Sequence, residues 1–363
     1  MNTETRRQPA WTEQVRPILD AIRIDSETSF LFRGTRIDAA AAPPAHLEDA
    51  CFNLNPLLYL LHRHIYTSFH MGVEAGAGDL SVRQLDTGAD SNTGAASPSA
   101  VNDDDDFKRQ LLEAYGGAAH LSREWKVLAA LNGGEVCARK AHRVRVWRPG
   151  QYVFDGAPAR PAKHDSVHVL LRKNSLTLQN GFYHAFGSFV ADEQSEGRSV
   201  RFYLNASREG AAEVARLVCG TFNARRVPFQ FKCLSGASDY ARHDSAVLYM
   251  GKRYAHVAVG LLGQMYPQLR AHLRARTPML AKPLAPGLAL AEDPDADDSF
   301  GTHRSRAIAE GLYTAFRHGQ HTEAERLDAV SKAFEEHNIS TEKPHLNAQP
   351  ADPFGLDLLE FPL

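Results

Sequence analysis

Apolar residues recur along this chain with two different periods, and the change from one to the other separates two regions. From about residue 11 to residue 69 the spacing is helical, as in VRPILDAIRI and NPLLYLLHRHIYTSF, which predicts helices there. Two further short helices are predicted in FKRQLLEAYGG and in SREWKVLAALNG, the second ending at its glycines.

The two-residue period of strands follows. Strands are expected in EVCARKAHRVRVWRPGQYVF, SVHVLLRK, RSVRFYLN, VPFQFKCL and DSAVLYM. Helices are expected in EGAAEVARLVCGTFNARR, AHVAVGLLGQMYPQLRAHL, SRAIAEGLYTAFRHG and TEAERLDAVSKAFEEHN. These segments together predict an α+β fold, in which a helical N-terminal part precedes a mainly antiparallel sheet packed with helices.

Composition suggests where the regions begin and end. We expect a helical N-terminal region over residues 1–71 and a flexible linker over residues 72–106, which are rich in Gly, Ala, Ser and Asp. An α+β domain is expected over residues 107–340. A Pro-rich, irregular tail is expected over residues 341–363.

Overall charge and targeting signals indicate a cytoplasmic protein. The 363 residues have a formal charge of -2, which favours neither nucleic acid nor a membrane surface as a partner. No apolar run reaches about 18 residues, and MNTETRRQPAW lacks the apolar core of a signal peptide. The four cysteines are widely spaced and are expected to be free thiols: Cys51, Cys137, Cys219 and Cys233.

Cationic side chains at sheet positions are the first candidate chemistry. In VPFQFKCL, Val227, Phe229 and Phe231 alternate on one face, so that Lys232 lies on the other. Arg201 occupies a similar position in RSVRFYLN, and Lys173 ends the strand VHVLLRK. Any one of these cations fits the solvated side of a strand. Several of them beside aromatic residues favour a site for an anion.

Arg304 is a further candidate. Ser299 is a plausible N-cap for the helix that follows it, and Arg304 then aligns with Ile308 and Leu312 on the apolar face. A buried arginine near a helix N-terminus suits a bound phosphate. The alternative is a buried ion pair with a carboxylate such as Asp244.

Several familiar motifs are missing from the sequence. It contains no Walker-type glycine loop, no G-x-S-x-G, no H-E-x-x-H and no cysteine cluster. We therefore expect neither a metal nor a cofactor.

Six stretches, in this order, resemble the HopA effector family of type III secreted proteins: GFYHAFG, RFYLN, VPFQFK, YARHDSAVLY, PMLAKPLAPGLALAEDP and SFGTHR. The resemblance covers roughly residues 165–315. Relatives of that family occur beside kinase-like proteins in the biosynthesis of class V lanthipeptides and of thioamide-containing peptides. The resemblance therefore implies the lyase half of a split dehydratase, acting on a phosphorylated ribosomal precursor peptide with a partner kinase.

The order of basic residues is also similar to that of the phosphothreonine lyases. That similarity implies a lyase-like fold, Lys232 as the general base, and Lys173, Arg242 and Arg304 as phosphate ligands. Arg201 is added to the expected phosphate ligands because of its position in its strand. Two features depart from the lyase pattern. No histidine follows Lys173 in RKNSLT, and Arg242 lies seven residues before Tyr249, which in a straight strand puts them on opposite faces.

Elimination of phosphate needs a base, anion ligands and an acid. Lys232 can remove a Cα proton if its pKa falls. Tyr249 or Tyr183 can stabilise the charge that develops on the amide oxygen. The general acid stays open among three histidines: His303, His184 and His168. The alternative function is a phosphopeptide-binding scaffold or an effector-like interaction protein without catalysis.

The basic run RKAHRVRVWR is a separate feature. Arg143 and Arg145 alternate with valines, so that one face of the predicted strand is cationic. This face can bind an acidic leader peptide or the partner kinase by strand addition. The alternative is a solvated edge strand that its charges protect from aggregation.

Overall fold

The computed structural model describes ten segments of the chain, and all structural statements below refer to them: residues 11–39, 55–73, 98–115, 120–140, 143–156, 160–171, 173–189, 199–294, 298–349 and 354–362. The predicted linker lies outside these segments over residues 74–97, as does Cys51. The other three cysteines are free thiols.

The N-terminal region contains strands as well as helices. Its elements are α1 (Trp11–Ala21), β1 (Ile22–Ser26), β2 (Ser29–Phe32), β3 (Thr35–Asp38), α2 (Pro56–Ile65) and the π-helix η1 (Tyr66–His70). The expectation that this region is wholly helical is therefore wrong. The two residues Arg33 and Gly34 join β2 to β3 with positive φ angles of 49° and 82°, which is the geometry of a tight hairpin turn.

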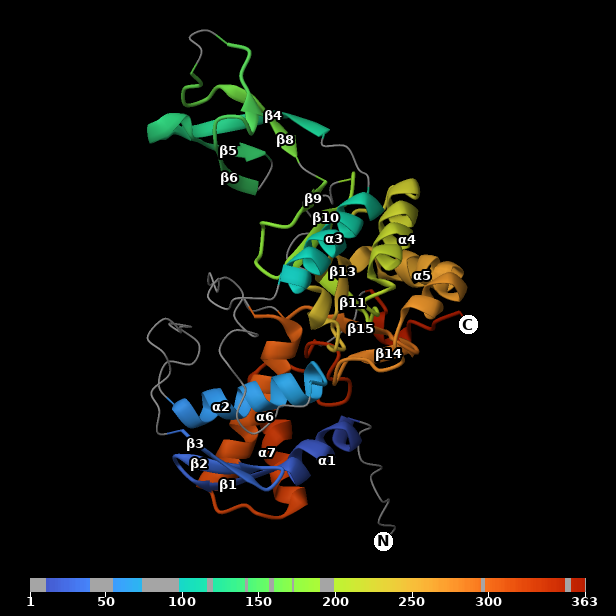
Figure 1. The fold of residues 1–363 in the computed structure, drawn as a ribbon. Coiled ribbons are helices and arrows are strands. Elements are labelled where there is room, and N and C mark those ends of the chain that lie inside the picture. The colour runs from blue at the N-terminus through green and yellow to red at the C-terminus, as the bar shows by residue number, and fades with distance from the viewer. Residues whose placement is uncertain are drawn as a thin grey trace.

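A five-stranded antiparallel sheet occupies the middle of the chain and forms a separate lobe in Figure 1. Its strands, in spatial order, are β6 (Arg143–Trp147), β5 (Val136–Lys140), β4 (His120–Ala130), β8 (Ser166–Leu171) and β7 (Tyr152–Val153). Trp125, Val127, Val136 and Val169 belong to the small apolar cluster that covers one face. The expected strands of this region are confirmed.

β4 corrects another expectation, because SREWKVLAALNG was predicted as a helix. Its pairing has irregularities between Ser122 and Trp125 and between Val127 and Ala129. Such bulges shift which residues face the core, so the apolar positions of β4 do not follow a strict two-residue period.

The seven-stranded antiparallel sheet forms the centre of the molecule. Its strands, in spatial order, are β14 (Lys282–Ala285), β15 (Leu288–Glu292), β11 (Ser199–Leu204), β13 (Ala246–Gly251), β12 (Gln230–Leu234), β10 (Phe182–Phe186) and β9 (Asn174–Ser175). The hairpin of β14 and β15 was not predicted. The three expected strands around Arg201, Lys232 and Tyr249 are confirmed.

Helices cover both faces of this sheet, as Figure 1 shows. One face packs against α3 (Pro98–Ala114), α4 (Ala211–Ala224) and α5 (Ala255–Leu269). Part of the other face packs against α6 (Phe300–Arg317), whose Phe300 ring lies 6.2 Å from that of Tyr203 in β11, and both α2 and α7 (Glu323–Glu336) lie against α6. This arrangement confirms the predicted α+β class. No helix in the described part of the chain is both long and apolar enough to cross a membrane.

The acidic run NDDDD is helical rather than part of a linker, because α3 begins at Pro98. Asp103 pairs with Arg208 at 2.5 Å, and the carboxylate of Asp104 accepts a hydrogen bond from the backbone N–H of Ala237 at 2.9 Å. These contacts attach α3 to the segments around Arg208 and Ala237, on either side of β12 in the chain.

Candidate active site

The register of the central strands places four of the predicted site residues on one face of the seven-stranded sheet. Lys232 of β12 lies directly opposite His184 of β10. Gln230, two residues before Lys232, lies opposite Tyr249 of β13, which in turn lies opposite Arg201 of β11. Directly opposed residues in an antiparallel pair point to the same side, as do alternate residues of one strand. Lys232, His184, Tyr249 and Arg201 therefore share a face.

Lys232 is half-buried on this face. Its Nζ atom lies 3.7 Å from the centre of the Phe182 ring, a favourable cation–π contact. Burial lowers the pKa of Lys232 from 10.5 to about 8, and the positive charges of Arg201 and Arg242 act in the same direction, against Asp244. Lys232 thus releases its proton near the pH range in which enzymic bases work.

Arg242 lies in the loop before β13 and is held by Asp244. Its Nε and Nη2 atoms donate to the two carboxylate oxygens at 2.9 and 2.8 Å. Burial by itself would raise the pKa of Asp244, but Arg242 holds it at about 2. The second neighbour of Asp244 is His70, whose Nε2 atom is 3.9 Å from Oδ2. Asp244 therefore stays ionised and fixes the orientation of the Arg242 guanidinium.

Arg201 is held in a similar way by Asp293, which accepts a hydrogen bond from its Nε atom. The guanidinium carbon lies 5.1 Å from the centre of the Tyr249 ring. Burial raises the pKa of Tyr249, and Arg201 partly offsets this rise. Tyr249 is therefore a neutral phenol near pH 7.

His184 is buried beside Lys232. Its Nδ1 atom is 3.1 Å from the amide nitrogen of Gln230, and no described group pairs with its Nε2 atom. Burial lowers the pKa of His184 to about 4, with a further contribution from the charge of Lys232. If the Gln230 amide donates to Nδ1, the neutral ring carries its proton on Nε2.

Two residues near the site were not predicted, Tyr66 and His70. Their rings stack at a centroid distance of 5.1 Å. Burial raises the pKa of Tyr66 to about 12, and the charges of Asp244, Arg242 and Arg201 also act on it. The sequence YTSFH offered only a helical apolar pattern, in which these polar rings had no distinguishing signal.

Part of the SFGTHR motif is explained by how closely the first turn of α6 passes the ring of His70. Ser299 is the N-cap of α6, as expected, and accepts a hydrogen bond from the backbone N–H of Thr302. A Cβ atom on Gly301 would lie 2.4 Å from Nε2 of His70, so the first turn of α6 can pass His70 only with glycine there. Phe300 completes the contact, with its ring 6.2 Å from that of His70.

Arg304 has a structural role, which corrects its assignment as a phosphate ligand. The side chain is fully buried. It donates hydrogen bonds of 3.0 Å to the backbone oxygens of Pro344 and Leu346 and to the side-chain oxygen of Asn347. Its Nη1 atom is also 2.8 Å from Nδ1 of His303. Arg304 therefore ties the C-terminal segment to α6, and His303 takes part in this anchor.

Three other predicted residues also lie apart from the cluster around Lys232. Lys173 is at the outer edge of the sheet and donates to the hydroxyl of Ser188. Tyr183 points to the opposite sheet face, where it is buried in the apolar core. His168 belongs to the five-stranded sheet, 3.6 Å from Asp155.

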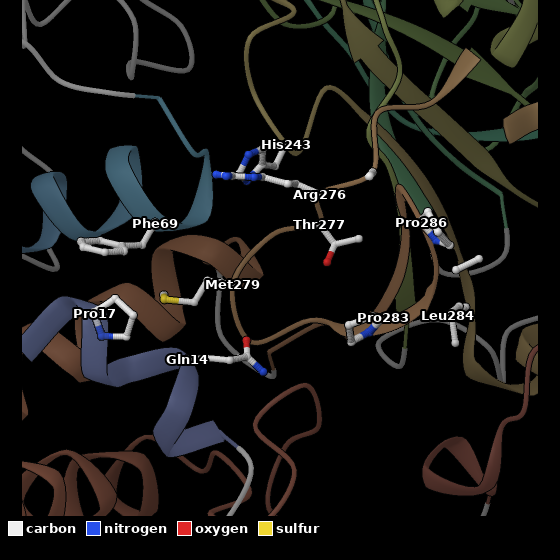
Figure 2. Close-up of a pocket in the computed structure, with 12 residues that line it drawn as sticks. Gln14, Pro17, Phe69, His243, Arg276, Thr277, Met279, Pro283, Leu284 and Pro286 are labelled. Atoms are coloured by element: carbon white, nitrogen blue, oxygen red, sulfur yellow. The ribbon is translucent and has the colours of Figure 1, made fainter. Parts of the chain in front are cut away.

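A cavity of about 590 Å³ has His243 in its lining but none of the cluster residues. Figure 2 shows His243 and Arg276 near each other at one end of it, with Phe69, Met279 and Pro17 among its apolar walls. His243 comes between Arg242 and Asp244 in the chain, so the cavity adjoins the loop that carries these residues. Such a mainly apolar hollow with a few polar groups suits part of a peptide.

The cluster combines one lysine and two arginines with two carboxylates. Lys232, Arg201 and Arg242 supply positive charge, while Asp244 and Asp293 hold the two arginines in place. Within the described residues, no three His, Cys, Asp or Glu side chains are grouped so that they could hold a metal ion.

Comparisons with known proteins agree with the resemblance found in the sequence. The HopA1 effector protein family matches residues 173–346. Among solved structures, an effector protein from Pseudomonas syringae pv. tomato strain DC3000 is similar with 18% identity and a TM-score of 0.39. An effector protein from Pseudomonas syringae pv. syringae strain 61 is similar with 22% identity and a TM-score of 0.35.

Each similarity to a solved structure covers 46% of this chain and 63% of the effector chain. No curated protein matches. The matched family segment includes all the strands of the seven-stranded sheet and α6, but neither the N-terminal region nor the five-stranded sheet. Residues 173–346, the segment that contains Lys232, Arg201 and Arg242, are therefore similar to the HopA1 effector protein family.

Proposed function

We propose that this protein eliminates phosphate from phosphoserine or phosphothreonine in a peptide, giving dehydroalanine or dehydrobutyrine. The observation that carries the proposal is Lys232, whose pKa of about 8 is set by burial and by Arg201 and Arg242. A lysine that loses its proton near neutral pH is suited to act as a base next to a bound phosphate.

In the proposed reaction, neutral Lys232 takes the Cα proton and becomes an ammonium. The electrons of the Cα–H bond form the Cα–Cβ double bond, and the Cβ–O bond breaks so that its electron pair leaves with phosphate. Arg201 and Arg242 hold the phosphate oxygens, since guanidinium groups match them in charge and shape. The reaction consumes no water, cofactor or metal.

Tyr249 and His184, which lie on the same sheet face as Lys232, fit the two remaining roles in the reaction: stabilising the amide oxygen and assisting the departure of phosphate. Tyr249 is a neutral phenol on the same face and can donate a hydrogen bond to the amide oxygen as negative charge develops there. The pKa of about 4 for His184 makes it a neutral hydrogen-bond donor to the leaving phosphate rather than an imidazolium acid. Of the three histidines considered from the sequence, His184 is the one opposite Lys232.

The substrate and partner follow from the resemblance to the HopA effector family. We infer that the substrate is a ribosomal precursor peptide in a pathway of the lanthipeptide type, phosphorylated by a kinase-like partner protein. The cavity beside His243 is then the place for residues that flank the phosphorylated one. The second candidate, a phosphopeptide-binding scaffold without catalysis, would use the same arginines but has no need of a lysine with a lowered pKa.

Incubation with a phosphothreonine peptide tests the proposal directly. We expect the peptide to lose the mass of one phosphoric acid, and the product to react with an added thiol, because dehydrobutyrine is an electrophilic alkene. A phosphatase would give threonine instead. Binding of the peptide without any mass change, both alone and with the kinase-like protein present, would favour the scaffold.

The pH dependence of elimination should follow Lys232. Its pKa of about 8 predicts that kcat/KM rises about eightfold between pH 6.5 and pH 7.5 and levels off above pH 8, as the neutral base becomes the major form. Bound phosphate stabilises the ammonium form, so the corresponding rise in kcat should occur at a higher pH. A rate that is flat from pH 6.5 to pH 9 would contradict Lys232 as the base.

A further inference from the structure

The outer face of the five-stranded sheet exposes an unusual amount of apolar surface. Val144 and Val146 of β6 are 51% and 52% exposed, and Leu121 and Leu170 are 42% and 44% exposed. Lys126 pairs with Arg139 and with Ser166, and Arg139 pairs with Val144. Val144 and Val146 therefore share one face of the sheet with Leu170 and its partner Leu121. That face is opposite the cluster around Trp125. The two exposed valines lie on this face of β6, at the edge of the sheet, where they offer an apolar surface to a further strand.

β6 also has a free edge. It is the first strand of the sheet and pairs with β5 alone among the described strands. An edge strand presents unpaired backbone N–H and C=O groups, to which an extended peptide can add as a further strand.

Charge indicates what kind of peptide fits. Residues 120–171 contain nine Lys or Arg and four Asp or Glu, although the whole chain has a net charge of -2. Arg139 and Arg145 are exposed, and neither forms an ion pair with a described residue. Three of the four acids have partners elsewhere: Glu135 pairs with Arg148, Asp155 lies 3.6 Å from His168, and Asp165 accepts a hydrogen bond from the backbone N–H of Ala162.

Two alternative partners for the edge of β6, the acidic run of the same chain and a second copy of the protein, fit less well. The acidic run at the start of α3 is already occupied, because Asp103 pairs with Arg208 and Asp104 with the backbone of Ala237. Pairing of β6 with β6 of a second copy would bring the two Arg145 side chains close together, and like charges repel across a strand pair.

We propose that the free edge of β6 binds an extended, acidic peptide segment as an additional strand. Side chains alternate across a strand, so every second residue of the peptide packs on Val144 and Val146. The residues between them carry carboxylates to Arg145, which lies on the opposite face of β6. The lobe lies outside residues 173–346, so this binding site is separate from the matched family segment and does not depend on lyase activity.

A labelled peptide of alternating Glu and Val tests the proposal with the full chain. By fluorescence anisotropy at low salt, we expect it to bind at least tenfold more tightly than a peptide of alternating Lys and Val. The substitution Arg145→Glu should weaken the binding at least tenfold. Arg225→Glu, a reversal at an exposed site on the main domain, should change it less than twofold.

Strand addition has its own signature in amide hydrogen exchange. Binding of the Glu–Val peptide should slow exchange at residues 143–147, and N-methylation of alternate peptide bonds should abolish binding. Equal affinity for the Lys–Val peptide, or no change in exchange at β6, overturns the proposal. A dimer in which β6 is protected without any peptide would assign the edge to a second copy and overturn it as well.

Discussion

Replacing Lys232 with alanine should reduce elimination of phosphate by a factor on the order of a hundred or more, while phosphopeptide binding stays nearly unchanged. The reason is that Arg201 and Arg242 keep their carboxylate partners without Lys232. Lys232→Arg should be equally inactive, because a guanidinium does not lose its proton in this pH range. Release of phosphate from a phosphothreonine peptide measures the first effect, and titration calorimetry measures the second.

Lys332→Ala is a matched control, because this lysine is exposed on α7. Its elimination rate should equal that of the unmodified protein. Full activity in Lys232→Ala would exclude Lys232 as the base. A collapse of binding in that variant would make the lysine a phosphate ligand instead.

Lys232 should also affect the free energy of unfolding, and its lowered pKa determines whether that effect is stabilising or destabilising. Its pKa is lower in the folded state, about 8, than the ordinary value of 10.5. Below pH 8, Lys232 is protonated in both the folded and the unfolded protein, so the folded protein is destabilised by the full free energy of burying the charge. Between pH 8 and 10.5 that cost declines as pH rises. Lys232→Met should therefore raise the free energy of unfolding near pH 7 by up to about 3 kcal/mol, less the lost contact with Phe182.

Replacing Arg304 with methionine should destabilise the fold by about 3–5 kcal/mol. The substitution removes the donor to Pro344, Leu346 and Asn347 and leaves their oxygens buried without it. An acceptor that is left unsatisfied in the interior costs about 1–3 kcal/mol. Urea unfolding measures the loss, and hydrogen exchange should show that residues 344–347 open first.

Arg317→Met, an exposed substitution on the same helix, is the control and should change stability by less than about 0.5 kcal/mol. Elimination per folded molecule should stay within threefold in Arg304→Met. If this variant is as stable as the unmodified protein but no longer binds phosphopeptide, Arg304 is a phosphate ligand after all.

The sequence predicted an element correctly where the spacing of its apolar residues matches the set of residues that are buried. In β12 the alternation of Phe231 with Lys232 predicted both the strand and its two faces, and Phe231 is indeed fully buried. The apolar faces of α4, α5, α6 and α7 predicted those helices, since each has one side against a core. Prediction failed at β4, where bulges disturb the period, and at β1 to β3, where short strands follow a helix without a strong turn signal.

Sequence patterns alone were enough to predict the α+β class, the strand that carries Lys232 and the similarity of residues 173–346 to the HopA1 effector protein family, because these depend on short-range patterns and motifs. Which cations lie together depends on how the strands and loops pack. Arg242 and Tyr249 lie seven residues apart, yet the loop before β13 brings Arg242 to the same cluster. Arg304 resembled a phosphate ligand because helix spacing shows only that a residue is buried, whereas its acceptors come from residues 344–347, about forty positions further along the chain. Contacts between residues so far apart depend on packing, which local periodicity does not contain.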